Sequence, residues 1–583
     1  MTTADTHDKR ESNYDKSPSI KVQGNVWTGW DAISRQLKTS LTGDLPILVL
    51  DTYSGIDENE LMEAFRTWDG FGIIRTSDLF RSENEIKAIT EEYVTEDDLF
   101  GYLSPLDIGD YFNLDSIACA RRRLRDRTTG MIVLGCGADY VEPNSDLLVY
   151  ADIARWELQQ RFRGKTAHNL GIDNTDESPA RKYKRGYFND WPLLDRHKKT
   201  VYGKADYWID ADRIGEPLMI DGETFMRGIE KAARSPFRVK PFFDPAPWGG
   251  QWMKSVCDLD KSKANYGWCF DCVPEENSLL LDVNDSLFEM PAQNLIYLKP
   301  VEVLGEANKR RFGESFPIRF DFLDTIGGGN LSLQVHPTNE YIRRTFGIRY
   351  TQDESYYLLD AEPGAHVYLG TKDGTDGEEM IAELYNAQNG GAGFDAEKFV
   401  NKFPASKHDH FLIPGGTIHC SGSGALVLEI SATPNIFTFK LWDWGRLGLD
   451  GKPRPINIGH ATHVIQWNRQ TEYVRKNLVN QITKIGEGEG WTEERTGLQE
   501  SEFIETRRHW FTGPVKHDTE GGVNVLNLIE GDAAIVESPS SAFAPYIVHY
   551  AETFIVPAAI GEYVIRPLVP GQRCGTIKAY VRN

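Results

Sequence analysis

The sequence predicts a multidomain protein in which a doubly wound α/β domain is followed by two antiparallel β-barrels. The chain has 583 residues, too many for one ordinary domain of roughly 100–200 residues. From about residue 45 to 235, short apolar runs alternate with helical patterns, which is typical of parallel strands joined by helices. From about residue 278 onward, short strands and glycine turns dominate, which is typical of a sandwich or barrel.

The N-terminal α/β domain is predicted over residues 21–235, after a polar, disordered tail at residues 1–20. The run ILVLD at 47–51 predicts a buried strand, and residues 58–68 predict the helix that follows it. The same alternation then predicts a helix over 114–127 and strands at 131–137 and 147–153.

The turn after the first strand lies where a P-loop kinase would place its phosphate loop. A working loop needs several glycines and a Lys–Ser/Thr pair, whereas DTYSGIDENEL has one glycine and no lysine. It would present four carboxylates to a phosphate: Asp51, Asp57, Glu58 and Glu60. Later segments resemble nucleoside kinases with a lid. We therefore expect a nucleoside-kinase-like module with a degenerate P-loop and a structural or regulatory role.

One segment of this domain concentrates basic residues. They are Lys182, Lys184, Arg185, Arg196, His197, Lys198 and Lys199. Such a cluster could bind an anion. A solvated basic face or an interdomain contact is the commoner explanation for a run of this kind.

The C-terminal half is divided by changes in composition. Residues 236–250 are rich in proline, glycine and aromatic residues, which indicates a boundary. A first barrel is predicted over 236–485, with a helical insert at 377–389. Residues 486–507 are polar and predict a linker, and 508–583 predict a second barrel.

Composition limits the partners of the protein. The 64 basic and 86 acidic residues give a net charge of −22, which argues against nucleic acid and anionic membrane surfaces. Seven cysteines do not form a secreted disulfide framework, and Cys269-x-x-Cys272 is expected to be simply buried. No secretory signal or membrane span is visible, so we expect a cytoplasmic protein.

The segment LSLQVHP carries the strongest chemical signal. Alternate side chains of a strand share a face, so Leu331, Leu333 and Val335 are expected in the core. The opposite, polar face would then carry Ser332, Gln334 and His336.

Two further segments supply metal-binding residue types where strands begin. Glu354 opens the next predicted strand, and His419 follows the tight turn at 414–416. Two imidazoles, a carboxylate and an amide oxygen suit zinc or another divalent first-row metal. A lone strand histidine is usually only a satisfied polar side chain, and spacing alone leaves the two interpretations about equally favoured.

Five motifs occur in the order in which one enzyme family has them. They are LSLQVHPTNEY, DESYYLLDAEPG, FLIPGGTIHCSGSGALVLEIS, DWGR and DGKPRPINI, with FPIRFDFLD and PFFDPAPWGG upstream. From about residue 237 to the C-terminus the chain resembles the class I mannose-6-phosphate isomerases. The resemblance implies an all-β cupin-type double barrel and one zinc ion, with Gln334, His336, Glu354 and His419 as its ligands.

The resemblance also implies an activity and a substrate class. Family members interconvert an aldose and a ketose phosphate through a cis-enediol, so the expected partner is a small-molecule sugar phosphate. Glu429 matches an acidic residue near the sugar, although a buried, paired carboxylate is an equally favoured reading. Trp248 matches a tryptophan that could form a cavity wall, with a surface turn as the alternative. Ser332 is a third substrate-site candidate, because it lies on the polar face of the ligand strand.

Two departures weaken mannose 6-phosphate as the specific substrate. The family carries a lysine two residues before the zinc-binding glutamate, where this chain has Gln352. It also carries an arginine after the Glu429 position, where the nearest match is Lys440. Arg446, Lys452 and Arg454 could contact a phosphate or be ordinary surface charges.

Two alternatives therefore stay open for the barrel: an isomerase of another sugar, or a metal- and sugar-binding protein without turnover. A nucleotide-dependent kinase is disfavoured by the missing phosphate loop. A homo-oligomer is neither indicated nor excluded.

Overall fold

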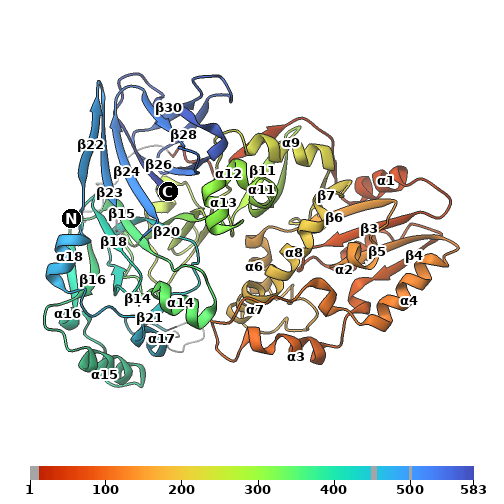
Figure 1. The fold of residues 1–583 in the computed structure, drawn as a ribbon, viewed down its shortest axis with the longest axis horizontal. Helices are drawn as coiled ribbons and strands as arrows, with labels where there is room; N and C mark the ends of the chain where they lie inside the picture. The colour runs from red at the N-terminus through yellow and green to blue at the C-terminus, as the bar shows by residue number, and fades with distance from the viewer. Residues whose placement is uncertain (1–11, 448–455, 498–501, 583) are drawn as a thin grey trace. The chain divides into compact units, whose positions relative to one another are not determined.

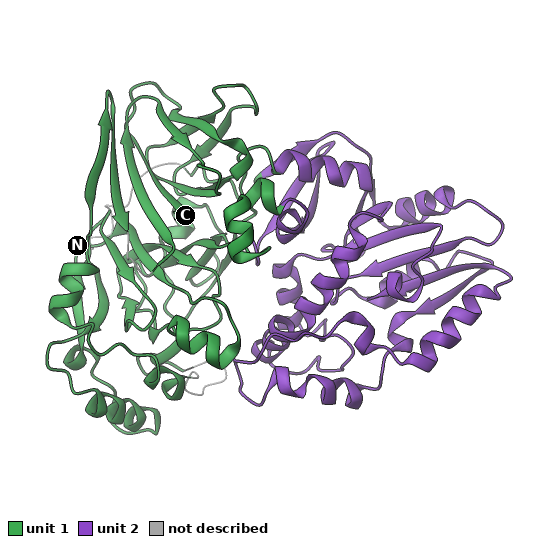
Figure 2. Ribbon diagram, viewed as in Figure 1, with its two compact units in different colours: residues 1–18, 233–273, 300–583 green, residues 19–232, 274–299 purple. Residues whose placement is uncertain are grey.

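A computed structural model describes residues 12–447, 456–497 and 502–582. The chain divides into two compact units (Figure 2). Unit 1 comprises residues 1–18, 233–273 and 300–583, and unit 2 comprises residues 19–232 and 274–299. Within the described residues, no helix combines the length and the apolar character that crossing a bilayer would require.

Unit 2 is built on a seven-stranded sheet of order β2-β8-β7-β6-β3-β5-β4 (Figure 1). Its strands are β2 (Val26–Thr28), β3 (Ile47–Thr52), β4 (Phe71–Arg75), β5 (Gly130–Gly135), β6 (Leu147–Asp152), β7 (Tyr207–Asp210) and β8 (Leu218–Asp221). Five strands, β3 to β7, are parallel, whereas β8 near one edge runs antiparallel to both of its neighbours, β7 and β2. The sheet is therefore mixed, and the prediction of a purely parallel arrangement was wrong at this edge.

Helices follow the strands of unit 2 as the alternating pattern predicts. They are α1 (Trp30–Ser40), α2 (Glu58–Ala64), α3 (Glu83–Val94), α4 (Leu114–Arg125), α6 (Arg155–Arg163), α7 (Pro179–Arg185), α8 (Trp191–Val201) and α9 (Gly222–Ala232). The Asp57 side chain caps the start of α2 by accepting a hydrogen bond from the Asn59 backbone amide. The Asn113 side chain caps the start of α4 in the same way, by accepting from the Ser116 backbone amide. The buried face of α1, with Ile33 and Leu37, packs in one core with apolar residues of β3 and β5.

Two segments lie outside the predicted domain limits. β1 (Ser19–Val22) pairs with β11 (Ser278–Val283), which pairs with β12 (Ser286–Pro291), and α11 (Gln293–Leu298) follows. Residues 274–299 thus belong to unit 2, although they were predicted in the first barrel. Hydrogen bonding of β1 to a strand more than 250 residues away leaves no local sequence signal.

The first β region of unit 1 consists of two facing antiparallel sheets. The six-stranded sheet has the order β18 (His410–Ile413), β15 (Glu354–Ala361), β20 (Ala425–Ala432), β13 (Ile318–Asp324), β10 (Trp268–Cys272) and β9 (Phe242–Asp244). The five-stranded sheet has the order β17 (Val400–Pro404), β16 (His366–Thr371), β19 (His419–Ser421), β14 (Leu333–Val335) and β21 (Phe439–Trp442). The predicted helical insert is α15 (Gly377–Gln388).

The second β region of unit 1 repeats this arrangement. Its six-stranded sheet has the order β22 (Thr483–Gly488), β23 (Trp491–Gly497), β24 (Ile504–Phe511), β31 (Cys574–Val581), β26 (Asn524–Glu530) and β29 (Thr553–Val556). Its four-stranded sheet has the order β25 (Val515–Asp518), β30 (Glu562–Pro567), β27 (Ala533–Glu537) and β28 (Tyr546–His549). The segment 486–507, predicted as a linker, contains residues of the strands β22, β23 and β24. Polar residues alternate along these strands, and a polar composition is also typical of a solvated linker.

A buried arginine holds the N-terminal segment against both β regions of unit 1. Arg238 pairs with Asp271 on β10 at 3.3 Å and with Glu552, just before β29, at 2.7 Å. It also donates to the Asp15 carbonyl oxygen at 2.8 Å, and Tyr14 is buried beside it. The described part of the predicted tail, residues 12–20, is therefore packed and not disordered; residues 1–11 lie outside the described part.

Replacing Arg238 with methionine should destabilise unit 1 strongly. Two buried carboxylates would lose their counter-charge, which typically costs about 3–5 kcal/mol. Denaturant unfolding followed by tryptophan fluorescence measures the loss. The control is Lys402→Met, because Lys402 pairs with Glu397 at the surface and should change stability by only about 0.5 kcal/mol. Equal effects of the two substitutions would contradict the proposed role of Arg238.

Candidate functional site

Three of the predicted metal ligands meet in the first β region of unit 1. His336 follows β14, Glu354 opens β15 and His419 opens β19. Glu354 Oε2 lies 3.1 Å from His336 Nε2, and Glu354 Oε1 lies 2.6 Å from His419 Nε2. All three side chains are buried, and their ligand atoms lie within 4.8 Å of one another. In the described part of the chain, no other group of three such residues meets this criterion.

The backbone determines which imidazole nitrogens face the centre. His336 Nδ1 lies 3.2 Å from the Phe437 carbonyl oxygen, and His419 Nδ1 lies 2.8 Å from the Thr417 carbonyl oxygen. A carbonyl oxygen only accepts, so each Nδ1 carries the hydrogen and each Nε2 directs a lone pair at the centre. This is the arrangement that orients histidine ligands in metal sites.

Gln334, the fourth predicted ligand, lies beside His419. It lies directly opposite His419 across β14 and β19, and its amide group is 3.3 Å from His419 Nε2. Ser332 lies 3.4 Å from the Gln334 Oε1 atom on the same polar face. An amide can turn over to exchange its nitrogen and oxygen, so Gln334 can offer oxygen at this point.

The charge of the three buried side chains fits a divalent cation. Burial raises the pKa of Glu354, but positive charge at His336 and His419 outweighs burial and lowers that pKa below its ordinary value. Neutral imidazoles would need a bound cation to supply that positive charge. His336 Nε2 and Glu354 Oε1 nevertheless have no well-formed hydrogen bond. Lone pairs that approach a carboxylate this closely repel unless a cation lies between them, and a metal ion would satisfy all of these atoms.

A second set of buried charges lies on the same face of the six-stranded sheet. Alternation along β13, β15 and β20 places Arg319, Asp321, Glu354 and Glu429 on one face, since Asp321 pairs with Glu429 and Tyr356 also pairs with Glu429. Arg319 lies 3.4 Å from Asp321 and 3.6 Å from Glu429. Burial raises the pKa of Asp321 to about 6, although Arg319 opposes this, and burial with Asp321 raises the pKa of Glu429.

Gln352 joins this set to the predicted ligands. Its Nε2 group donates to Glu354 Oε2 at 3.2 Å and to Glu429 Oε1 at 3.1 Å. The residue that departs from the family pattern thus bridges a predicted ligand and the predicted acidic residue. Sequence reasoning missed Arg319 and Asp321, although they are two charged residues at alternate positions of the apolar run FPIRFDFLD.

Lys440 lies near the predicted ligands, whereas two other predicted residues are held elsewhere. Lys440 on β21 pairs directly with Gln334, so both side chains leave the five-stranded sheet on one face. Arg446 is tied to Asp443 and donates to the Asn330 carbonyl oxygen at 2.6 Å. Trp248 is buried against Trp268. Neither Arg446 nor Trp248 has a contact with His336, Glu354 or His419 among the interactions of the described residues. Lys452 and Arg454 lie outside the described residues.

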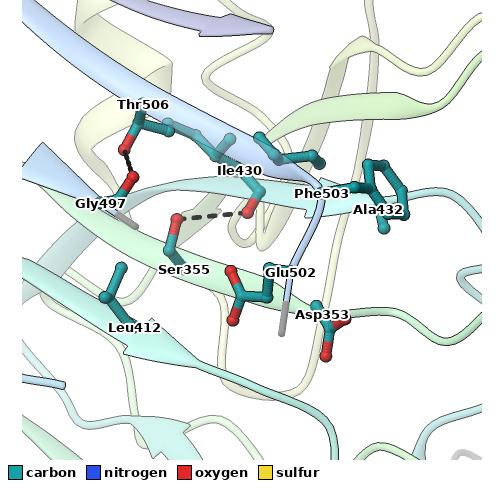
Figure 3. A pocket seen from close by; sticks show the side chains of 10 residues that line it. Asp353, Ser355, Leu412, Ile430, Ala432, Gly497, Glu502, Phe503 and Thr506 are labelled. Carbon is teal, nitrogen blue, oxygen red and sulfur yellow. Dashed lines mark hydrogen bonds between the residues drawn. The ribbon is translucent and has the colours of Figure 1, made fainter. Parts of the chain in front are cut away.

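A small cavity lies on the other face of β15. Ser355 and Asp353 line it together with Glu502, Thr506 and residues of β20 (Figure 3). Its volume of about 10 Å³ accommodates one water molecule and no sugar. The carboxyl groups of Asp353 and Glu502 make it polar, and burial raises the pKa of both. This cavity lies between the two six-stranded sheets and is large enough for one buried water molecule.

The carboxylates of the degenerate phosphate loop in unit 2 all have internal partners. Asp51 lies 2.6 Å from His197 Nε2 and accepts from the Gly137 and Asp139 amides. Asp57 caps α2 and Glu58 accepts from Ser77. Glu60 accepts from the Trp30 indole and the Gly215 amide.

The basic cluster of unit 2 is largely buried. Lys198 pairs with Asp152 at the end of β6 at 3.1 Å, and His197 pairs with Asp51 at the end of β3. Lys182 donates to backbone carbonyl oxygens, and Arg185 lies 3.8 Å from Asp190. A solvated basic face is therefore wrong for these residues, because His197 and Lys198 pair with carboxylates at the edge of the sheet, Arg185 pairs with Asp190, and Lys182 donates to backbone carbonyl oxygens.

The two cysteines of the CxxC pair are buried and free, as expected. Both lie on β10 in the six-stranded sheet of the first β region. Tyr14 Oη lies 3.9 Å from the Cys269 sulfur, and burial raises the pKa of that thiol. A buried thiol with a raised pKa is an inert side chain.

Two known proteins are similar in sequence to part of this chain. The mannose-6-phosphate isomerase ManA of Bacillus subtilis (strain 168) is 24% identical over 235 residues, which are 40% of this chain and 68% of that protein. The mannose-6-phosphate isomerase of Streptococcus mutans is 29% identical over 225 residues, which are 37% of this chain and 64% of that protein. This chain is distantly related to mannose-6-phosphate isomerases.

Two further comparisons concern solved structures and the N-terminal region. A crystal structure of the mannose 6-phosphate isomerase from Bacillus subtilis aligns with 60% of this chain and 100% of its own, at 19% identity and a TM-score of 0.49. A family model described as a domain of unknown function, DUF8485, matches residues 29–234. The kinase-like character of unit 2 stays a prediction.

Removing one imidazole should remove the metal. We expect His336→Ala to lose bound divalent metal in elemental analysis of the purified protein, because removing an imidazole nitrogen from the four predicted ligands weakens metal binding. The control His463→Gln changes an exposed histidine of the same unit and should keep the metal content. Equal metal content in the two variants would contradict the site, as would a metal-free wild type after incubation with zinc.

Proposed function

We propose that this protein is a metal-dependent aldose–ketose isomerase that interconverts mannose 6-phosphate and fructose 6-phosphate, or a closely related sugar. Zinc is the proposed ion, held by Gln334, His336, Glu354 and His419. One observation carries the proposal: Glu354 meets both imidazoles in a buried site beside a second carboxylate, Glu429. The distant relationship to mannose-6-phosphate isomerases supports the same reaction class.

The reaction requires a carbon-bound proton to leave and return on the neighbouring carbon. A divalent ion in this site would polarise the sugar oxygens and so acidify that proton. Glu429 is the proposed carrier, because it is a buried carboxylate that Gln352 links to Glu354 and is not itself a predicted ligand. Arg319 and Gln352 both lie against its Oε1 atom, at 3.6 and 3.1 Å. Lys440 is proposed to face the sugar from the opposite sheet.

Gln352 supports a second candidate, a metal- and sugar-binding protein without turnover. A glutamine has no titrating group, so it cannot replace a lysine in proton transfer. In this chain the Gln352 amide group donates hydrogen bonds to Glu354 and Glu429. The two candidates make opposite predictions about proton exchange.

Exchange with solvent of the C2 proton of an aldose, or of a C1 proton of a ketose, followed by NMR, separates the two candidates. The zinc-loaded full chain should exchange at least one of mannose, fructose, their 6-phosphates and related aldoses. His336→Ala should exchange none, and His463→Gln should behave as wild type. Binding of a sugar without exchange would support the second candidate, and neither binding nor exchange would refute both.

Glu429→Gln should lower kcat without removing the metal. The substitution keeps the shape and the contact with Gln352 but cannot carry a proton, and such a loss is typically about 10²- to 10⁴-fold. Kinetics and elemental analysis on the same preparation check both parts. Asp321→Asn is the matched control from the same carboxylate group, and it should reduce kcat less. An unchanged kcat in Glu429→Gln would exclude Glu429 as the carrier.

A further inference from the structure

A group of polar side chains lies inside the second β region of unit 1, apart from the predicted metal ligands. Phe511 on β24, Val515 on β25 and Cys574 on β31 belong to one apolar core between the two sheets. Because alternate residues share a face, His509, His517, Thr576 and Lys578 point into the same interior. We call these four residues the inner polar group.

Cross-strand pairing brings the inner polar group together. His509 lies directly opposite Thr576 across β24 and β31, and Lys578 is the next inward residue of β31. His517 on the facing sheet brings its ring to 4.6 Å from the ring of His509, measured between centroids. The other side of His517 stacks on Tyr563. The four side chains therefore converge from three strands and both sheets.

Each member of the inner polar group is buried without a full set of partners. His509 Nδ1, His517 Nε2 and Thr576 Oγ1 are buried and have no hydrogen-bond partner within the described residues. Lys578 is 8% exposed, and its ammonium has no hydrogen bond or ion pair with any described residue. Buried polar groups are nearly always satisfied, so several unsatisfied groups at one point indicate something that occupies the space between them.

The charges around the inner polar group favour an anion. The two carboxylates on this face are already engaged, since Arg507 pairs with Glu493 at 3.1 Å and with Glu505 at 2.8 Å. His509 Nε2 also lies 3.3 Å from Glu493. Lys578 has no direct ion pair: its ammonium lies 5.4 Å from the centre of the Tyr580 ring, and Glu493, Glu505 and Glu520 act on it only at longer range. A buried ammonium without a direct ion pair is costly. Burial lowers the pKa of both imidazoles, and Lys578 lowers them further.

We propose that the inner polar group binds a small oxyanion, a phosphate ion or the phosphate group of a small metabolite. The Lys578 ammonium and the Thr576 hydroxyl donate to its oxygens, and His517 Nε2 donates as a third partner. A divalent cation does not suit this place, because the Lys578 charge would repel it. A water molecule would satisfy the hydroxyl but would leave the ammonium uncompensated. The proposed site is independent of the isomerase activity.

Calorimetric titration of the full chain with inorganic phosphate tests the site. We expect saturable binding that His336→Ala leaves unchanged and that Lys578→Met and Thr576→Val each weaken roughly tenfold or more, since a hydrogen bond to a charged group is worth that much. Lys516→Met is the matched control, because Lys516 is exposed and points away from the interior of the same region. Circular dichroism confirms that each variant compared is folded.

A second arm with glycerol 3-phosphate distinguishes the source of the phosphate group. Tighter binding of the ester than of phosphate, with the same dependence on Lys578, assigns a phosphorylated metabolite. Tighter binding of phosphate assigns the free ion. The site would be overturned if millimolar phosphate and glycerol 3-phosphate both failed to bind. It would also be overturned if the folded Lys578→Met and Thr576→Val variants bound as tightly as wild type, or if only His336→Ala lost binding.

Discussion

Buried negative charge is the constraint on which the first β region of unit 1 depends. Glu354, Glu429 and Asp321 project from one face of a single sheet, where desolvation makes each charge costly. Arg319 lies within ion-pair distance of Asp321 and Glu429. The imidazoles compensate Glu354 only if a proton or a metal ion lies between them. A divalent cation therefore has a structural as well as a chemical reason to occupy the site.

In unit 2, basic side chains of the same unit compensate two buried carboxylates. Asp51 and Asp152 lie at the carboxyl ends of β3 and β6, the edge at which parallel α/β sheets usually bind ligands. His197 and Lys198, consecutive residues of α8, reach these two carboxylates. The cations that might have held a phosphate are thus already used inside the fold. These ion pairs compensate the charge of Asp51 and Asp152 at that edge.

Much of the architecture could be predicted because it is local. The strand at 47–51, the helices after 58 and 114, and the polar face of 332, 334 and 336 all follow from periodicity. The pairing of β1 with β11, the packing of Tyr14 and the strands hidden in the polar segment 486–497 depend on distant partners, so composition is misleading there. At the site, residue types indicated His336, Glu354 and His419, but the contribution of Arg319 needed the register of β13 against β20.

The residue type at position 352 affects the charge balance of the site. A lysine there would add a cation between Glu354 and Glu429 and would compete with a metal ion for the same negative charge. Glutamine donates two hydrogen bonds without adding charge, so the carboxylates keep their full attraction for a divalent ion. The departure therefore need not weaken the metal site, and in the proposed reaction proton transfer would fall to the carboxylates. Glutamine at position 352 thus gives the site one positive charge fewer than a lysine would. In the proposed reaction, catalysis would therefore depend more heavily on Glu429.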